Sequence, residues 1–221
     1  SKTQGKNTLS SSDYKAGDRI PTKNGKYYMV IFGMSMDRAP SVITKATKFD
    51  KVYCVGDSRT ADTKMALGVA VPSNVEFIAK WGEGLYWFKS TGYRQLLSYV
   101  SKQPKNSKKA VIINLGVNDL NNGRAYVTYM KKVAANLKKY NCKMYYLSVN
   151  PVNSAMIKSV GGKARSEAQI ASFNRTIYKN LCSGKNKSFT YINSCTNLQM
   201  KGWISNRHDM GIYDGLHYSN A

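Results

Sequence analysis

The sequence is poor in acidic residues and contains no long hydrophobic run. Its 221 residues include 12 Asp and Glu against 34 Lys and Arg, which gives a formal net charge of +22. No apolar stretch approaches the roughly 20 residues that a membrane-spanning helix needs. The chain begins Ser-Lys-Thr-Gln without the apolar core of a signal peptide, so we expect either a mature, processed form or a cytoplasmic protein. The length predicts one domain with an N-terminal extension.

The excess of positive charge predicts attraction to anionic partners at low salt, because a broad positive potential concentrates anions near the surface. Nucleic acid, anionic lipid and an anionic cell-wall or polysaccharide matrix all fit that description. Lys and Arg are spread along nearly every segment and no known RNA or DNA module is present, so we expect no specific nucleic-acid binding. An anionic envelope or polysaccharide surface is favoured, and with it a secreted or cell-surface location over a cytoplasmic one.

Residues that commonly bind metals are scarce. The four cysteines show no C-x-x-C spacing, so we expect no thiolate metal site. Cys54 lies in an apolar run, where a buried thiol is expected. Cys182 and Cys195 flank a short strand candidate, and the sequence leaves open whether they form a disulfide. The two histidines are His208, in a polar stretch, and His217.

The N-terminal part of the chain differs in composition from the rest. Residues 1–26 are rich in Lys, Ser, Thr, Gly and Asn without an apolar period, which is typical of a polar arm. Residues 27–32 have strand composition and predict an accessory strand or hairpin arm. We therefore divide the chain into an N-terminal arm with an accessory strand, residues 1–49, and a main domain, residues 50–221.

Five apolar runs of strand composition alternate with helical stretches in the main domain. In the clearest helical stretch, residues 124–140, apolar side chains recur at three- and four-residue steps and lysines take the opposite face. This alternation predicts an α/β fold with a parallel sheet, because parallel neighbours need crossover connections. Ligands bind to such sheets at the carboxyl ends of the strands. The predicted strands are 52–55, 75–79, 110–115, 144–149 and 189–192.

Two polar positions follow predicted strands at this edge. Ser58, in Gly-Asp-Ser-Arg, comes directly after the first strand, where a serine is exposed and lies at the positive end of a helix. The same residues also suit a turn and helix cap with no chemical role. Arg59 adds a positive charge that either favours anionic substrates or points to solvent. Asn118 follows the third strand, and its amide is either an oxyanion donor or a turn residue.

A carboxylate and an imidazole lie close together near the C-terminus. Asp214 precedes His217 by three residues, so a turn would let the carboxylate orient the ring of a general base. His208, followed by Asp209, is the competing histidine. A single histidine is more often structural than catalytic, so the pair acquires meaning only together with the serine and the asparagine.

Three segments resemble conserved blocks of the SGNH (GDSL-like) hydrolase family, in that family's order. They are Gly56-Asp57-Ser58, Gly116-Val117-Asn118-Asp119 and Asp214-Gly215-Leu216-His217. The family also places a glycine after the second strand, where its backbone N–H joins the oxyanion hole; Gly82 is the best match and Gly84 is the alternative. The resemblance covers residues 50–219. It implies a flavodoxin-like three-layer α/β/α sandwich with a mostly parallel five-stranded sheet, and ester hydrolysis without a cofactor or metal.

The resemblance also implies a role for each site residue. Ser58 is expected to be the nucleophile, His217 the general base and Asp214 its partner, with the oxyanion held by Ser58 N–H, Gly82 N–H and the Asn118 amide. We expect a serine esterase that removes short acyl groups, acetyl above all, from a carbohydrate or cell-wall glycan. A catalytically silent glycan-binding module and an O-acyltransferase are the alternatives. The aromatic residues near the site are expected to form either a sugar platform or part of the core: Trp81, Tyr86, Trp87 and Tyr213.

Overall fold

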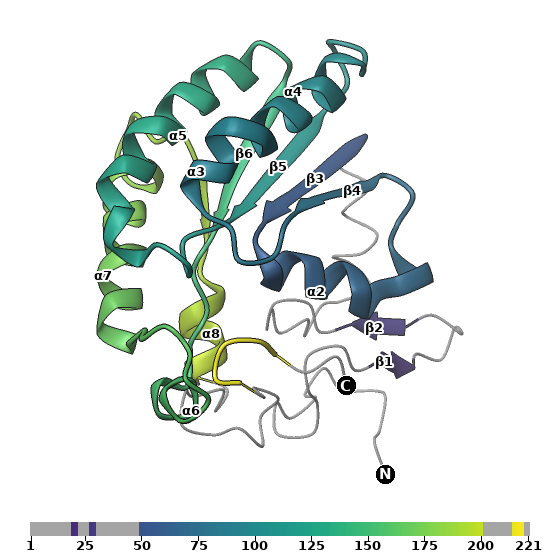
Figure 1. Ribbon diagram of the computed structural model, residues 1–221. Helices are drawn as coiled ribbons and strands as arrows, with labels where there is room; N and C mark the ends of the chain where they lie inside the picture. Colours follow the sequence, from purple (N-terminus) through teal and green to yellow (C-terminus); the bar gives the residue numbers. More distant parts are fainter. Residues whose placement is uncertain (1–18, 22–26, 30–48, 201–213, 219–221) are drawn as a thin grey trace.

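The computed structural model describes residues 19–21, 27–29, 49–200 and 214–218 (Figure 1). In its N-terminal part, β1 (Arg19–Pro21) pairs antiparallel with β2 (Tyr27–Met29). The prediction of a strand or hairpin arm at residues 27–32 is thus confirmed for residues 27–29, and residues 30–32 lie outside the described part of the chain. The strand β1 was missed within the expected polar arm, because three residues are too short to show an alternating pattern. The division of the chain at residue 50 stays a prediction.

The main sheet has five strands, and every pairing between neighbours is parallel. Each of the five predicted strands is confirmed, with ends shifted by a few residues. The order β4-β3-β5-β6-β7 is that of flavodoxin-like doubly wound sheets. The strands are β3 (Lys51–Gly56), β4 (Val75–Ala79), β5 (Lys109–Asn114), β6 (Cys142–Leu147) and β7 (Thr190–Ile192).

Helices cover both faces of this sheet, as the resemblance implied. Figure 1 shows α4, α5 and α7 along one face and α2 on the other. The helix predicted at residues 124–140 is α5, which runs from Gly123 to Lys138. The helices are α2 (Ser58–Leu67), α3 (Leu85–Trp87), α4 (Tyr93–Ser101), α5 (Gly123–Lys138), α6 (Ser154–Ser159), α7 (Glu167–Ile177) and α8 (Ser194–Met200).

The alternation of strand side chains places a separate core on each face. In β4, Phe77 packs with Leu67 of α2, whereas the next residue, Ile78, joins the large cluster that includes Leu96 of α4 and Phe173 of α7. Burial of each such side chain contributes roughly 1.5–3 kcal/mol. Within the described residues, no helix combines the length and the apolar character needed to cross a membrane.

The disulfide left open between Cys182 and Cys195 is not formed; both are free, buried thiols. Burial raises the pKa of each to about 12, so they stay protonated and uncharged at neutral pH. Cys54, also free, packs against the smaller core beside Phe77 and is partly buried, so the expected burial of its thiol is met in part.

The register of the sheet brings three loops to one edge. Gly56, the last residue of β3, lies beside Asn114 of β5 and Ala79 of β4. The turn that carries Ser58, the loop after β4 and the loop after β5 therefore leave the sheet together at its carboxyl edge, where the sequence predicted the site.

Candidate active site

Ser58 is the first residue of α2, and Asp57 caps that helix by accepting a hydrogen bond from the backbone N–H of Arg59 at 3.0 Å. The capping interpretation is thus correct for Asp57 and leaves the Ser58 hydroxyl free for other contacts. Burial raises the pKa of Asp57 to about 6, although the Arg59 charge and backbone N–H oppose the rise. Ser58 is only 2% exposed, not open to solvent as expected, because residues 214–218 pack against it.

A continuous chain of hydrogen bonds joins Ser58, His217 and Asp214. The Nε2 atom of His217 lies 2.7 Å from the Ser58 Oγ, and Nδ1 lies 2.7 Å from the Asp214 Oδ2. The other carboxylate oxygen of Asp214 accepts the backbone N–H groups of Leu216 and His217 at 2.8 and 2.7 Å. The predicted turn therefore forms, and it places the imidazole where it can take a proton from the serine hydroxyl.

The charge on Asp214 is stabilised by the same contacts. Burial on its own would raise the pKa of Asp214, but the hydrogen bonds from His217 and Leu216 outweigh it, and the pKa lies below its ordinary value. An ionised carboxylate at Nδ1 fixes the ring tautomer that leaves Nε2 free to accept a proton, and it stabilises the imidazolium that then forms.

Arg59 holds the C-terminal segment on the helix that carries Ser58. Its guanidinium donates to the backbone carbonyls of Leu216, Asn150 and Pro151, each at 2.9 Å, and lies over the ring of Tyr218 at 5.3 Å. The residue is 4% exposed. Both earlier interpretations, a substrate-facing charge and a solvent-facing side chain, are therefore wrong: its donors are used inside the protein.

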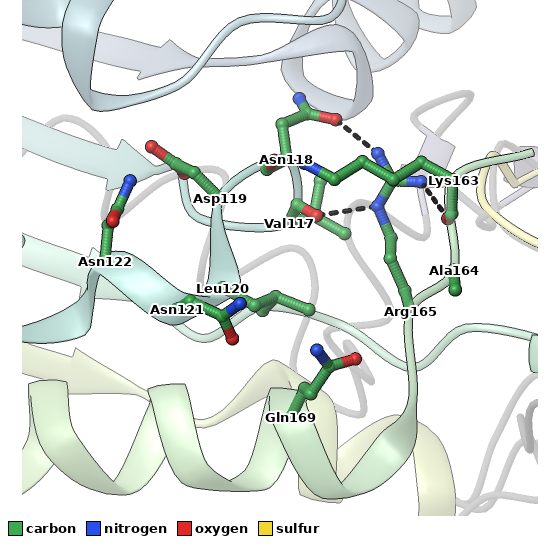
Figure 2. A pocket seen from close by; sticks show the side chains of 10 residues that line it. All are labelled: Val117, Asn118, Asp119, Leu120, Asn121, Asn122, Lys163, Ala164, Arg165 and Gln169. Carbon is green, nitrogen blue, oxygen red and sulfur yellow. Dashed lines mark hydrogen bonds between the residues drawn. The ribbon is translucent and has the colours of Figure 1, made fainter.

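The side-chain amide of Asn118 is held from both ends. Its Nδ2 donates to the Glu83 carbonyl at 2.9 Å, and its Oδ1 accepts from Arg165 at 2.8 Å (Figure 2). Arg165 also donates to the Val117 and Lys163 carbonyls at 2.7 and 2.9 Å. One N–H of the Asn118 amide is left for another acceptor. The sequence carried no signal for Arg165, which lies 47 residues from Asn118 and whose two other acceptors are backbone carbonyls.

The next residue, Asp119, fixes the loop after β4. Its two carboxylate oxygens accept the backbone N–H of Leu85 at 2.9 Å and the hydroxyl of Tyr126 at 2.7 Å. Gly84 is required there, because a Cβ at that position would lie 2.5 Å from Asp119. Gly82 instead has a left-handed φ of +71° with open space around its Cα. The two glycines thus serve different purposes, and the oxyanion role of the Gly82 N–H stays a prediction.

The four aromatic residues have different environments. Trp81 is 54% exposed, and its ring centroid lies 5.4 Å from that of His217, whereas Tyr86 is an exposed residue of α3. Trp87 is buried in the core. Tyr213 and the competing histidine, His208, lie outside the described residues. Among the described members of this group, Trp81 is therefore the one that lies beside His217.

No protein-family model and no curated protein sequence matches the chain. Solved structures do resemble it. A GDSL-like lipase from Bacteroides thetaiotaomicron has a TM-score of 0.53 at 17% identity, over 85% of this chain and 90% of that one. A Bacteroides fragilis protein described as a candidate acylhydrolase has a TM-score of 0.52 at 16% identity, over 77% of this chain and 79% of that one. A candidate GDSL-like lipase from Parabacteroides merdae has a TM-score of 0.50 at 13% identity, over 77% of this chain and 89% of that one.

At such identities the likeness concerns the fold, which many activities can share. The strand order, the parallel pairings and the two helical layers agree with that likeness. The chain has the fold of the SGNH/GDSL-like hydrolases, as its three sequence blocks implied.

Proposed function

We propose that the protein is a serine esterase in which Ser58 is the nucleophile, His217 the general base and Asp214 its partner. The observation that carries this proposal is the pair of 2.7 Å contacts that His217 makes, one with the Ser58 Oγ and one with Asp214. A serine hydroxyl needs such a base, because it is a weak nucleophile at its free pKa.

The geometry supports a two-step reaction. The Ser58 Oγ attacks the ester carbonyl while its proton moves to the His217 Nε2; the tetrahedral intermediate then expels the alcohol oxygen, which takes that proton from His217. A water molecule next gives a proton to His217, and its oxygen attacks the acyl-serine. The acid is released and Ser58 recovers its proton from His217.

The negative oxygen of each intermediate needs donors at the same edge of the sheet. The proposed donors are Ser58 N–H, Gly82 N–H and the Asn118 amide. The bond from Asn118 to the Glu83 carbonyl supports this grouping, because it ties the loop after β5 to the loop after β4. Loss of one such donor costs roughly 10²–10³ in rate in serine hydrolases.

The proposed substrate is a short acyl ester, acetyl above all, on a carbohydrate or cell-wall glycan. Trp81 supports this choice, since an exposed aromatic ring beside His217 offers an apolar face for a sugar ring. The net charge of +22 is suited to an anionic envelope or polysaccharide surface, and a secreted or cell-surface location goes with that proposal.

The proposal is tested by hydrolysis of para-nitrophenyl acetate, its longer-chain homologues and acetylated glycans by the wild type and Ser58→Ala. Ser98→Ala is a matched control, because Ser98 is an exposed serine on α4. We expect the wild type and the control to hydrolyse acetyl esters, and we expect the rate of hydrolysis by Ser58→Ala to be at least about 10³-fold lower. Equal, negligible rates for all three proteins across the panel would contradict the esterase proposal and favour a glycan-binding module or a transferase.

A further inference from the structure

A small polar pocket is lined in part by Asn118, and its lining includes neither Ser58 nor His217. It has a volume of about 220 Å³ and is formed by the loop after β5 and the segment that leads into α7 (Figure 2). This is below the roughly 300–1,000 Å³ of sites that enclose a whole small ligand, so the pocket suits one substituent of a larger molecule. Besides Asp119, the polar side chains of its lining are Asn118, Asn121, Asn122, Lys163, Arg165 and Gln169.

The lining of this pocket has more positive than negative side chains: Lys163 and Arg165 against Asp119. Asp119 also lines the pocket, but its oxygens are taken by the Leu85 N–H and the Tyr126 hydroxyl. Its single negative charge offsets that of Arg165, whose guanidinium already donates to three oxygens. Among the described residues, no carboxylate lies within ion-pair distance of Lys163. One ammonium group is left over.

Several side-chain N–H donors in the same lining have no hydrogen-bond partner among the described residues. Lys163 is exposed, and its Nζ makes one long contact of 3.3 Å, to the Asn118 carbonyl. The side-chain oxygen of Gln169 accepts from Ser166 in the cap of α7, which leaves the NH₂ group of Gln169 as a donor. Asn121 and Asn122, both exposed, add further amide donors at the opposite wall. One cation surrounded by amide donors matches a singly charged carboxylate.

We propose that this pocket is a subsite for a carboxylate on the ester substrate, with Lys163 as its cationic contact. The inference rests on the proposed esterase function and narrows its substrate class to acylated acidic glycans, such as those that contain uronic acids. Asn118 connects the two sites, because it belongs to the proposed oxyanion hole and also to the pocket wall. A carboxylate bound there would place a nearby ester carbonyl at the edge of the sheet that carries Ser58.

The test compares esters that differ only in charge: meta- and para-acetoxybenzoate against their methyl esters. The proteins are the wild type, Lys163→Gln and the control Lys143→Gln. Lys143 is an exposed lysine near the start of β6, at the opposite end of the strands. The control removes the same charge from the overall positive field, so it separates a local contact from general attraction.

We expect the wild type to prefer at least one charged ester over its methyl ester in kcat/KM. Lys163→Gln should lower kcat/KM for that ester roughly fivefold, with little change for the methyl ester, whereas Lys143→Gln should leave the preference in place. Hydrolysis of the methyl esters without any preference for the charged ones, or a preference that survives Lys163→Gln, would overturn the subsite alone. Failure of the wild type to hydrolyse any of the four esters would overturn the esterase proposal, and the subsite with it.

Discussion

Replacement of Arg165 by Met tests whether this residue acts through Asn118. The guanidinium donates to the Asn118 Oδ1 at 2.8 Å, and among the described residues the one other hydrogen bond of the amide is from its Nδ2 to the Glu83 carbonyl at 2.9 Å. Methionine retains most of the apolar stem but none of the donors. The amide would then lose its restraint on one side and could rotate away from the position in which its remaining N–H faces an oxyanion.

The size of the effect follows from these contacts. Complete loss of an oxyanion donor costs roughly 10²–10³ in kcat. Because the bond to Glu83 survives in Arg165→Met, we expect only part of that loss, about ten- to thirtyfold in kcat, with KM nearly unchanged since the ground-state ester gains little from this donor. The freed carbonyls of Val117 and Lys163 also lose a partner, so a small fall in stability is expected.

A double-mutant cycle with para-nitrophenyl acetate separates positioning from general structural damage. Asn118→Ala, Arg165→Met and the double variant are compared with the wild type, and Arg124→Met, at an exposed arginine of α5, serves as the control. If Arg165 acts through Asn118, adding Arg165→Met to Asn118→Ala should change kcat by less than about twofold. Losses that multiply across the cycle would refute the reasoning, because they would show that Arg165 contributes independently of the amide.

Two further predictions concern the residues on either side of Ser58. Arg59→Met should lower the free energy of unfolding by about 3 kcal/mol or more, because it leaves three carbonyls without their charged donor. It should also lower kcat under conditions where the variant is folded. An unchanged midpoint of urea unfolding would contradict this prediction. For Asp57, whose pKa is raised to about 6 from an ordinary 3.8, the folded state holds a proton that the unfolded state releases, so its contribution to stability falls as the pH rises from about 4 to about 6. Asp57→Asn keeps the capping acceptor and should be more stable than the wild type by about 1–3 kcal/mol near pH 7 but not near pH 4; an equal difference in urea unfolding at both pH values would show that the buried charge is not its cause.

The local patterns in the sequence predicted the α/β class and the parallel sheet, and the resemblance of the three blocks implied the flavodoxin-like sandwich. Each of the five strands of the main sheet lies in an apolar run, and α5 carries a regular helical period, so both types of element were predicted within a few residues. The strand β1 escaped because Arg-Ile-Pro has no room for a pattern. The open question of a disulfide between Cys182 and Cys195 needed the distance between the thiols, which spacing along the chain does not provide.

In the candidate site, too, contacts between residues close in sequence were predicted, and contacts between residues far apart in sequence were not. The contact between Asp214 and His217 is a turn of a few residues and was predicted from their spacing. Arg59 and Arg165 were misjudged or missed because their partners are mainly backbone carbonyls far along the chain, up to 157 residues away for Arg59 and Leu216. Every residue type carries a backbone carbonyl, so no sequence motif marks such a contact.

Direct capture of the acyl-enzyme tests whether Ser58 is the nucleophile. The protein is mixed with para-nitrophenyl acetate, quenched with acid within the first turnover and examined by intact-mass and peptide mass spectrometry, beside Ser58→Ala and His217→Ala. We expect one added acetyl group on the peptide that contains Ser58 in the wild type, and no acetylation of that peptide in either variant. Acetylation confined to lysines, at the same level in all three proteins, would contradict this expectation.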